Sequence, residues 1–162
     1  MEELLKQSDL LQGLPDEDAR RISAIATTQN LTSGEYLFLL GDNADRLHVL
    51  LKGQVDLCFP MSLGETLKDV SVEVVAPGQT LGWSALVRPY RFTLSARAAG
   101  VTQVACFART DLLEFFDAEP RIGYAVLTRL SELVGIRLLT VQALWARGLQ
   151  RAVTSDKTHD TK

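Results

Sequence analysis

The chain has 162 residues and a formal net charge of −3, a length that suits one well-buried core and is too short for two ordinary domains. Its apolar share of 46% and charged share of 23% are typical of globular proteins and exclude a disordered chain or a disulfide-rich miniprotein. The net negative charge argues against a broad electrostatic surface for nucleic acid.

The first predicted element is a short helix after residue 14. The run Leu14–Asp18 puts a proline and three acids at a helix start, and Ile22 and Ile25 follow at helical spacing. The turn residues Thr32–Glu35 then mark a change of the apolar period from about 3.6 to 2. We therefore expect strands from this point on.

Several short strands follow, each closed by a turn signal. Apolar residues alternate along 47–51 and 55–59, the run Ser62–Glu65 has the composition of a hairpin tip, and Pro77-Gly78 marks another turn. A further strand is expected over Thr102–Cys106. Close spacing of short strands with glycine turns predicts a jelly-roll or β-roll barrel.

The C-terminal third returns to helical periodicity. A long helix is expected to begin at Pro120 and to end at about Arg147. One apolar stripe of this helix is formed by Leu127, Leu130, Val134, Leu138, Val141 and Trp145. Because a helix of this length exceeds what a small barrel covers, we expect a homodimer through this stripe.

Other features exclude several classes of protein. The acidic start Met1–Lys6 is unlike an export signal and the apolar stretches are too short to span a bilayer, so we expect a cytoplasmic protein without membrane association. Cys58 and Cys106 have no neighbours at metal-ligand spacing, and His48 has no companion ligands. With no nucleophile motif or P-loop in the sequence, we do not expect an enzyme.

Three stretches carry a more specific pattern. The run Phe38–Val55 places two strands around a Gly-Asp turn, Pro77–Gly82 gives a short strand and turn, and Gly82–Val87 is followed after a gap by Thr93–Ala96. Together they resemble the cyclic nucleotide-binding domain of the catabolite-activator (Crp/Fnr) family. The resemblance implies a mainly β fold with flanking helices: a β-roll, a double-stranded jelly-roll-like barrel, with N-terminal helices and a long C-terminal helix.

The resemblance also implies a ligand site. The family holds the cyclic phosphate on a phosphate-binding cassette, a short helix and loop whose backbone N–H groups face the ligand. Thr93 matches the position of the family's ligand-contacting hydroxyl group. The ligand-binding residues implied in this chain are Gly82, Trp83, Ser84, Ala85, Leu86, Tyr90, Arg91 and Thr93.

Two cassette positions depart from the family pattern. Trp83 stands where the family has a glutamate for the ribose, and Tyr90 stands three residues before Thr93, where the family has an arginine for the phosphate. Charge-assisted hydrogen bonds contribute roughly 1.5–3 kcal/mol each, so both losses together cost about two to four decades in affinity. Arg91 is in reach of the phosphate if the loop register shifts by one residue, and Arg88 is a further nearby donor. Trp83 is read equally well as an aromatic wall for a nonstandard ligand or as a packing residue.

We expect one domain over residues 1–150, which includes the dimerisation helix, and a flexible tail over 151–162. The leading hypothesis is a small-molecule-sensing regulatory module that signals through a partner chain, with an unidentified output protein. No cofactor is assigned, and the implied ligand is cyclic AMP, cyclic GMP or another small anionic or aromatic molecule. The alternative is a degenerate fold that serves as a dimerisation or protein-interaction scaffold without nucleotide binding. The residues after Arg151 are too few for a helix-turn-helix, so direct DNA binding is not expected.

Overall fold

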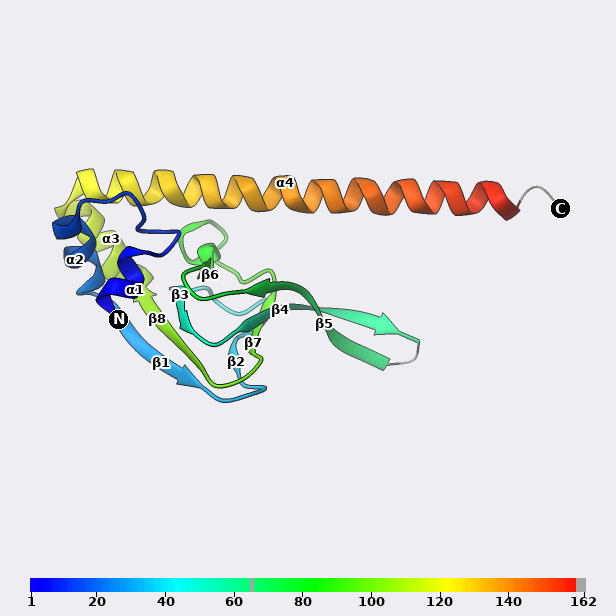
Figure 1. The fold of residues 1–162 in the computed structure, drawn as a ribbon, viewed down its shortest axis with the longest axis horizontal. Coiled ribbons are helices and arrows are strands. Elements are labelled where there is room, and N and C mark those ends of the chain that lie inside the picture. Colours follow the sequence, from blue (N-terminus) through cyan, green and yellow to red (C-terminus); the bar gives the residue numbers. More distant parts are fainter. Residues whose placement is uncertain (65, 160–162) are drawn as a thin grey trace. The chain divides into compact units, whose positions relative to one another are not determined.

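The computed structural model describes residues 1–64 and 66–159 (Figure 1). Two short helices precede the strands, α1 (Glu2–Lys6) and α2 (Asp16–Ser23), and two helices follow them, α3 (Arg109–Ala118) and α4 (Pro120–His159). The strands are β1 (Thr27–Leu31), β2 (Tyr36–Phe38), β3 (Arg46–Lys52), β4 (Val55–Leu63), β5 (Thr66–Val75), β6 (Thr80–Leu81), β7 (Ser95–Ala98) and β8 (Thr102–Ala108). A 3₁₀ helix, η1 (Trp83–Leu86), lies between β6 and β7.

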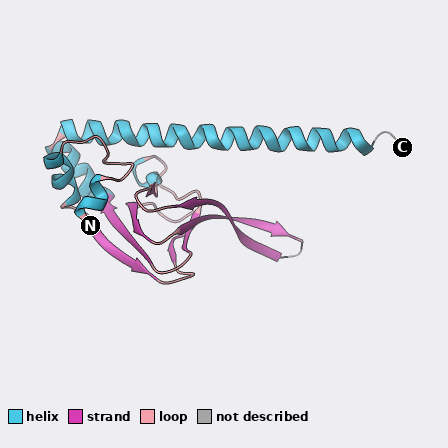
Figure 2. Cartoon of the chain, viewed as in Figure 1, coloured by secondary structure: helices cyan, strands magenta, loops and turns pink. Residues whose placement is uncertain are grey.

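The strands form two antiparallel four-stranded sheets, with the orders β1-β8-β3-β6 and β2-β7-β4-β5. Figure 2 shows these strands as one β-roll with the short helices beside it. The apolar residues of β3 between Arg46 and Lys52 are buried, as are Leu81 in β6 and Phe107 in β8. The predicted mainly β barrel with flanking helices is confirmed.

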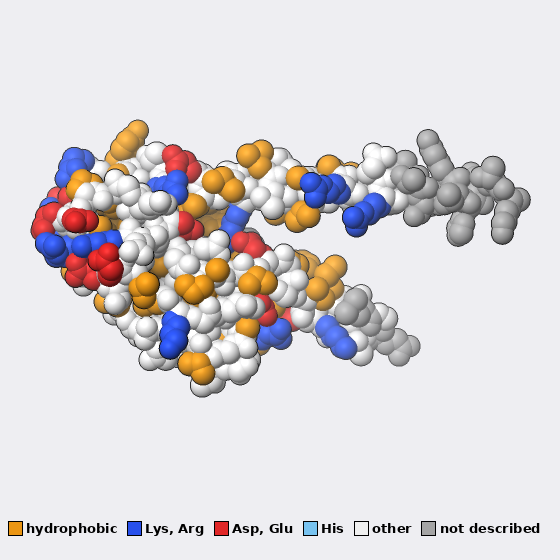
Figure 3. Space-filling model, in the orientation of Figure 1, with side chains coloured by type: hydrophobic (Ala, Val, Ile, Leu, Met, Phe, Trp, Pro, Cys, Tyr) orange, Lys and Arg blue, Asp and Glu red, His pale blue; other side chains and the backbone are white. Residues whose placement is uncertain are grey.

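The chain divides into two compact units, Met1–Arg129 and Leu130–Lys162. The first contains the β-roll, the N-terminal helices, α3 and the first turns of α4. The second contains the rest of α4, where Leu138, Val141 and Trp145 are exposed and Leu130 is buried. Figure 3 shows hydrophobic side chains at intervals along the described surface of this helix.

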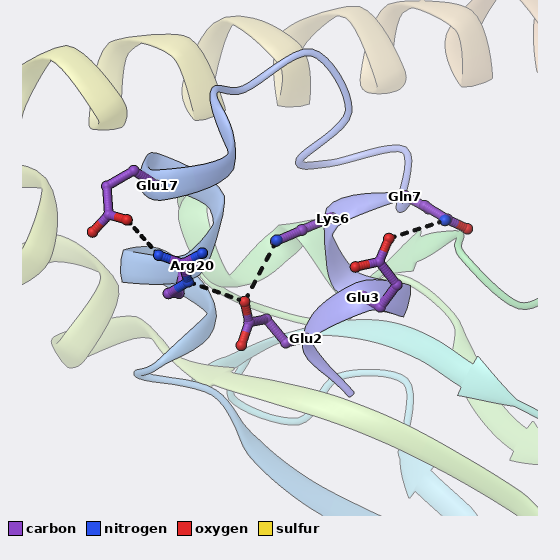
Figure 4. A network of polar contacts seen from close by, with 6 residues as sticks. All are labelled: Glu2, Glu3, Lys6, Gln7, Glu17 and Arg20. Carbon is purple, nitrogen blue, oxygen red and sulfur yellow. Dashed lines mark hydrogen bonds and ion pairs between the residues drawn. The ribbon is translucent and has the colours of Figure 1, made fainter.

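The N-terminal helices are tied together by charged side chains (Figure 4). Arg20 in α2 donates hydrogen bonds to Glu17 in its own helix and to Glu2 in α1, and Glu2 also pairs with Lys6. Acids in the first turn and bases in the last turn complement the helix dipole in both helices. Of these pairs, Arg20–Glu2 joins α1 to α2, and exposed pairs of this kind contribute little individually.

The segment after α1 holds the strand that leads to the predicted cassette. The backbone N–H of Asp9 donates to the carbonyl of Gly78 at 2.8 Å, and the Asp9 carboxylate accepts from both the N–H and the hydroxyl of Thr80 in β6. Arg129, at the C-terminal end of the first unit, donates to the Asp9 carbonyl oxygen at 2.7 Å. The segment Gly78–Thr80, which leads to Gly82, is therefore held in place by Asp9 from the N-terminal part of the chain.

The structure differs from the sequence expectation at two boundaries. Strand β1 lies before the Thr32–Glu35 turn, whereas strands were expected only after it; its exposed polar residues Thr27, Thr28 and Asn30 hide the alternating pattern. Helix α4 ends at His159 rather than near Arg147. The sequence after Gly148 contains no proline or glycine that would end a helix.

The division into a domain at 1–150 and a tail at 151–162 stays a prediction, and residues 160–162 of that tail lie outside the described residues. Over the described part of the chain, no helix combines the length and the apolar character that a membrane span requires.

Candidate functional site

The predicted cassette begins at a glycine that no other residue replaces easily. Gly82 adopts a left-handed conformation with φ of 75° and is the N-cap of η1. A Cβ atom on Gly82 would lie 3.0 Å from Nδ1 of His48, 3.2 Å from the carbonyl oxygen of Arg46 and 3.3 Å from the ring of Phe92. Both the backbone conformation and the close packing therefore require glycine.

The residues of η1 follow this glycine in a tight turn. The N–H of Ala85 donates to the Gly82 carbonyl at 3.0 Å, and Ser84 and Ala85 are buried. Trp83 and Leu86 are half-buried. The backbone shape expected of a cassette is present here, with no acidic side chain in the first turn of η1.

Tyr90 lies on the loop after η1 and faces arginines. Its φ is 59°, in the left-handed region that non-glycine residues rarely adopt. The Tyr90 ring centroid is 4.4 Å from the guanidinium carbon of Arg109 and 5.8 Å from that of Arg88. Its carbonyl accepts from the N–H of Ala44 at 2.8 Å. Tyr90 is thus packed between the loop and the start of α3 by cation–π contacts.

Arg91 is exposed, and its guanidinium donates to the carbonyl of Gly41 at 3.0 Å. Its backbone forms an isolated antiparallel bridge with Asn43. Thr93, two residues on, is also exposed. The structure thus brings Gly82, Ser84 and Ala85 together, and directs the Arg91 guanidinium to the β2–β3 turn.

Phe92 occupies the place beside Gly82 and was not among the residues expected at the site. It is buried, and its ring stacks on Phe38 in β2 with centroids 3.7 Å apart and planes 9° from parallel. The signal that could have found it is the alternation along 91–93, where an apolar residue stands between Arg91 and Thr93.

His48 also lies beside Gly82. It is buried in β3, where it pairs with Leu81 and Cys106. Its Nδ1 atom has no hydrogen-bond partner among the described residues. Burial, and secondarily the charge of Arg46, lowers the pKa of His48 to about 3. The imidazole is therefore neutral at physiological pH.

The two cysteines lie in separate strands, Cys58 in β4 and Cys106 in β8. Both are buried with free thiols, and burial raises the pKa of each, to about 11 for Cys106. Within residues 1–64 and 66–159, no group of three or more His, Cys, Asp and Glu side chains has the arrangement of a metal site.

Comparison with known proteins gives one family and a consistent fold. The model of the cyclic nucleotide-binding domain family matches residues 28–119, more than half of the chain. A Geobacter metallireducens protein that is provisionally called a cyclic nucleotide-binding protein is 28% identical, with a TM-score of 0.68 and coverage of 84% of this chain and 96% of that chain. The Thermus thermophilus catabolite activator protein is 23% identical, with a TM-score of 0.71 and coverage of 85% and 62%.

A curated relative extends the comparison to a larger protein. Glutaminase 1 of Bradyrhizobium diazoefficiens is 27% identical over 143 residues, which is 86% of this chain and 21% of the relative. The chain therefore spans about a fifth of the length of the curated relative that it matches.

Proposed function

The chain belongs to the cyclic nucleotide-binding domain family, and on that premise we propose that it is a regulatory module that senses a small molecule other than a cyclic nucleotide. One observation carries the proposal: the cassette retains its glycine and helical turn, while an apolar ring lies beside that glycine. The backbone shape of the cassette is retained while its side-chain chemistry differs. This combination favours a domain that binds another ligand over a domain that has lost its binding site.

The charges that a cyclic phosphate and ribose need are missing from the cassette. Trp83 offers no carboxylate, and Phe92 brings a ring close to Gly82. Arg91, the nearest replacement cation in sequence, is exposed and bound to the Gly41 carbonyl. An anionic ligand placed there without a charged partner loses the charge-assisted bonds, at roughly 1.5–3 kcal/mol each.

The signal is proposed to leave through α4 to a second copy and then to an output outside this chain. Exposed apolar side chains along α4, including Leu127, Leu138, Val141 and Trp145, support pairing with a second copy. The match to one fifth of a protein named as a glutaminase supports a module that works beside a separate output. Regulation rather than catalysis is therefore the proposed role.

A scaffold without a ligand is the second candidate function. It is favoured by the stacked pair of Phe38 and Phe92, which fills space near Gly82 with apolar rings. In that case only the apolar side chains of α4 carry function, through dimerisation or binding of another protein.

A crystal structure of protein purified from its natural source distinguishes the sensor from the scaffold. The sensor predicts density for a small molecule near Gly82, and the same protein unfolded, freed of small molecules and refolded is the matched control. Density of the same quality in both samples, or none in either, would favour the scaffold.

A further inference from the structure

Asp9, in the segment between α1 and α2, is hydrogen-bonded both to the strand before the cassette and to α4. Its backbone N–H donates to the Gly78 carbonyl, and its carboxylate accepts from the N–H and the hydroxyl of Thr80 in β6. Its carbonyl oxygen accepts from Nε of Arg129 at 2.7 Å. All four residues belong to the first compact unit. Asp9 therefore connects two parts of this unit that are distant in the sequence.

The strand β6 needs the contact with Asp9 because it is short and lies at the edge of its sheet. It consists of Thr80 and Leu81, and β3 is its single neighbour in the sheet order β1-β8-β3-β6. The Asp9 carboxylate gives the Thr80 N–H the acceptor that a further strand would otherwise supply. Hydrogen bonds to a carboxylate are charge-assisted and stronger than those between neutral groups. Because Gly82 directly follows β6, Asp9 helps to position the residue at which η1 begins.

Arg129 lies at the point where α4 leaves the first unit. The next residue, Leu130, begins the second unit, and the helix continues through this boundary without a break. Arg121, earlier in α4, pairs instead with Asp18 in α2. Two arginines of α4 thus bind two different places in the N-terminal segment, and it is Arg129 whose partner residue also holds β6.

We propose that Asp9 is the positioning residue through which the cassette and α4 affect one another. Hydrogen bonds weaken steeply when their geometry is distorted, so Asp9 either follows a displacement of Thr80 or loses its bonds to it. A movement of Asp9 alters the bond that its carbonyl accepts from Arg129, and a movement of α4 acts on Thr80 by the same route. This role rests on the proposed function, since it is the route by which an occupied cassette signals through α4.

Amide hydrogen exchange of the full chain, followed by NMR, tests the direction from α4 to the cassette. Arg129→Leu keeps an aliphatic side chain and removes the guanidinium donor, and Arg121→Leu makes the same change at the contact with α2. The amides of β8, which lies inside its sheet, report global unfolding and serve as the reference. Relative to them, we expect the N–H groups of Thr80 and Ala85 to exchange at least about threefold faster in Arg129→Leu. The same ratio should be unchanged in Arg121→Leu.

The Arg129 side chain tests the direction from the cassette to α4. Thr80→Val removes the hydroxyl that donates to Asp9, and Thr27→Val removes a hydroxyl in β1 that donates to the Cys106 carbonyl. We expect the Arg129 Nε–H resonance to shift, and its proton to exchange with solvent about two- to threefold faster, in Thr80→Val and not in Thr27→Val. This pair of variants decides the question if Arg129→Leu fails to fold.

A purely structural role for Asp9 predicts effects that stop at this residue. In that case Arg129→Leu changes the exchange of the Asp9 N–H and not that of Ala85, and Thr80→Val leaves the Arg129 Nε–H unchanged. Either result shows that the proposal is wrong. Tight binding of a cyclic nucleotide overturns the proposed function whatever these protons do, whereas equal exchange ratios in Arg129→Leu and Arg121→Leu overturn the coupling alone.

Discussion

His48 lies inside the β-roll, and its surroundings hold the imidazole neutral. Burial and the neighbouring charge of Arg46 lower its pKa to about 3, against an ordinary value of about 6.5. Below pH 6.5 the His48 imidazole is therefore protonated in the unfolded chain, whereas in the folded chain it stays neutral down to about pH 3. The stability that this neutral histidine confers is complete above pH 6.5 and is lost as the pH falls towards 3.

We expect the free energy of unfolding of the wild type to fall through His48 by about 1.4 kcal/mol per pH unit below 6.5, or about 2 kcal/mol by pH 5. His48→Phe carries no such proton, so its stability should fall less steeply. Urea unfolding of both proteins at pH 7 and pH 5 measures the difference. Equal losses in the two proteins would show that His48 is not held neutral by its environment.

Gly82 is constrained twice, by its left-handed backbone and by its neighbours. Gly34 has the same kind of backbone, with φ of 86°, but a Cβ there would meet nothing within 4 Å. Gly34→Ala should cost about 1–2 kcal/mol from the backbone alone. Gly82→Ala should cost at least about 1 kcal/mol more, because its methyl group meets Nδ1 of His48 and the Arg46 carbonyl. Thermal unfolding measures the loss of stability in the two variants. Equal losses would mean that His48 and Arg46 move aside at no cost in free energy.

The cassette shows which parts of a site can be predicted from the sequence. Its position was predictable from the resemblance of Pro77–Gly82 and Gly82–Val87 to the family's pattern, and η1 begins directly after Gly82. The alternation along 91–93 marks Phe92 as an inward residue, but its place beside Gly82 was not predictable, because it depends on the β2–β3 turn, where Gly41 accepts from Arg91. The short strand β1 was not predicted for a related reason, because it forms by pairing with β8, which is distant in the sequence.

Restoring charges to the cassette tests whether missing charge prevents the binding of cyclic nucleotides. We expect Trp83→Glu with Phe92→Arg to raise the affinity for cyclic AMP by at least about tenfold, since one charge-assisted hydrogen bond contributes roughly 1.5–3 kcal/mol. Trp83→Glu with Tyr90→Arg is the matched alternative and should gain less, because residue 90 already faces Arg88 and Arg109. Calorimetric titration measures both, after near-ultraviolet circular dichroism confirms folding. If neither variant gains affinity, something other than missing charge prevents binding.

In an isolated chain, α4 presents apolar side chains to solvent. Leu138 is 56% exposed and Trp145 is 68% exposed, and such residues on one helix favour pairing with a second copy. The stripe expected from the sequence is only partly available, because Leu130 is buried. The surface that would pair therefore centres on residues 138–145.

Leu138→Glu should convert the proposed dimer to monomers, because it places a charge within an apolar interface. Thr140→Glu adds the same charge at an exposed polar position on α4 and should leave most of the dimer intact. Sedimentation velocity at tens of micromolar distinguishes them, a concentration at which modest interfaces persist. A wild type that is already monomeric there would refute the dimer.

We propose that this domain keeps the family's cassette without its recognition of cyclic nucleotides. Calorimetric titration of the wild-type chain with cyclic AMP and cyclic GMP tests it directly, with an intact family member as the positive control. We predict no saturable binding below about 0.1 mM for either nucleotide, as the loss of two charge-assisted partners requires. Saturable binding of one nucleotide per chain at submicromolar concentration would contradict the claim, and its loss in Arg91→Ala would show that Arg91 leaves the Gly41 carbonyl to take the phosphate.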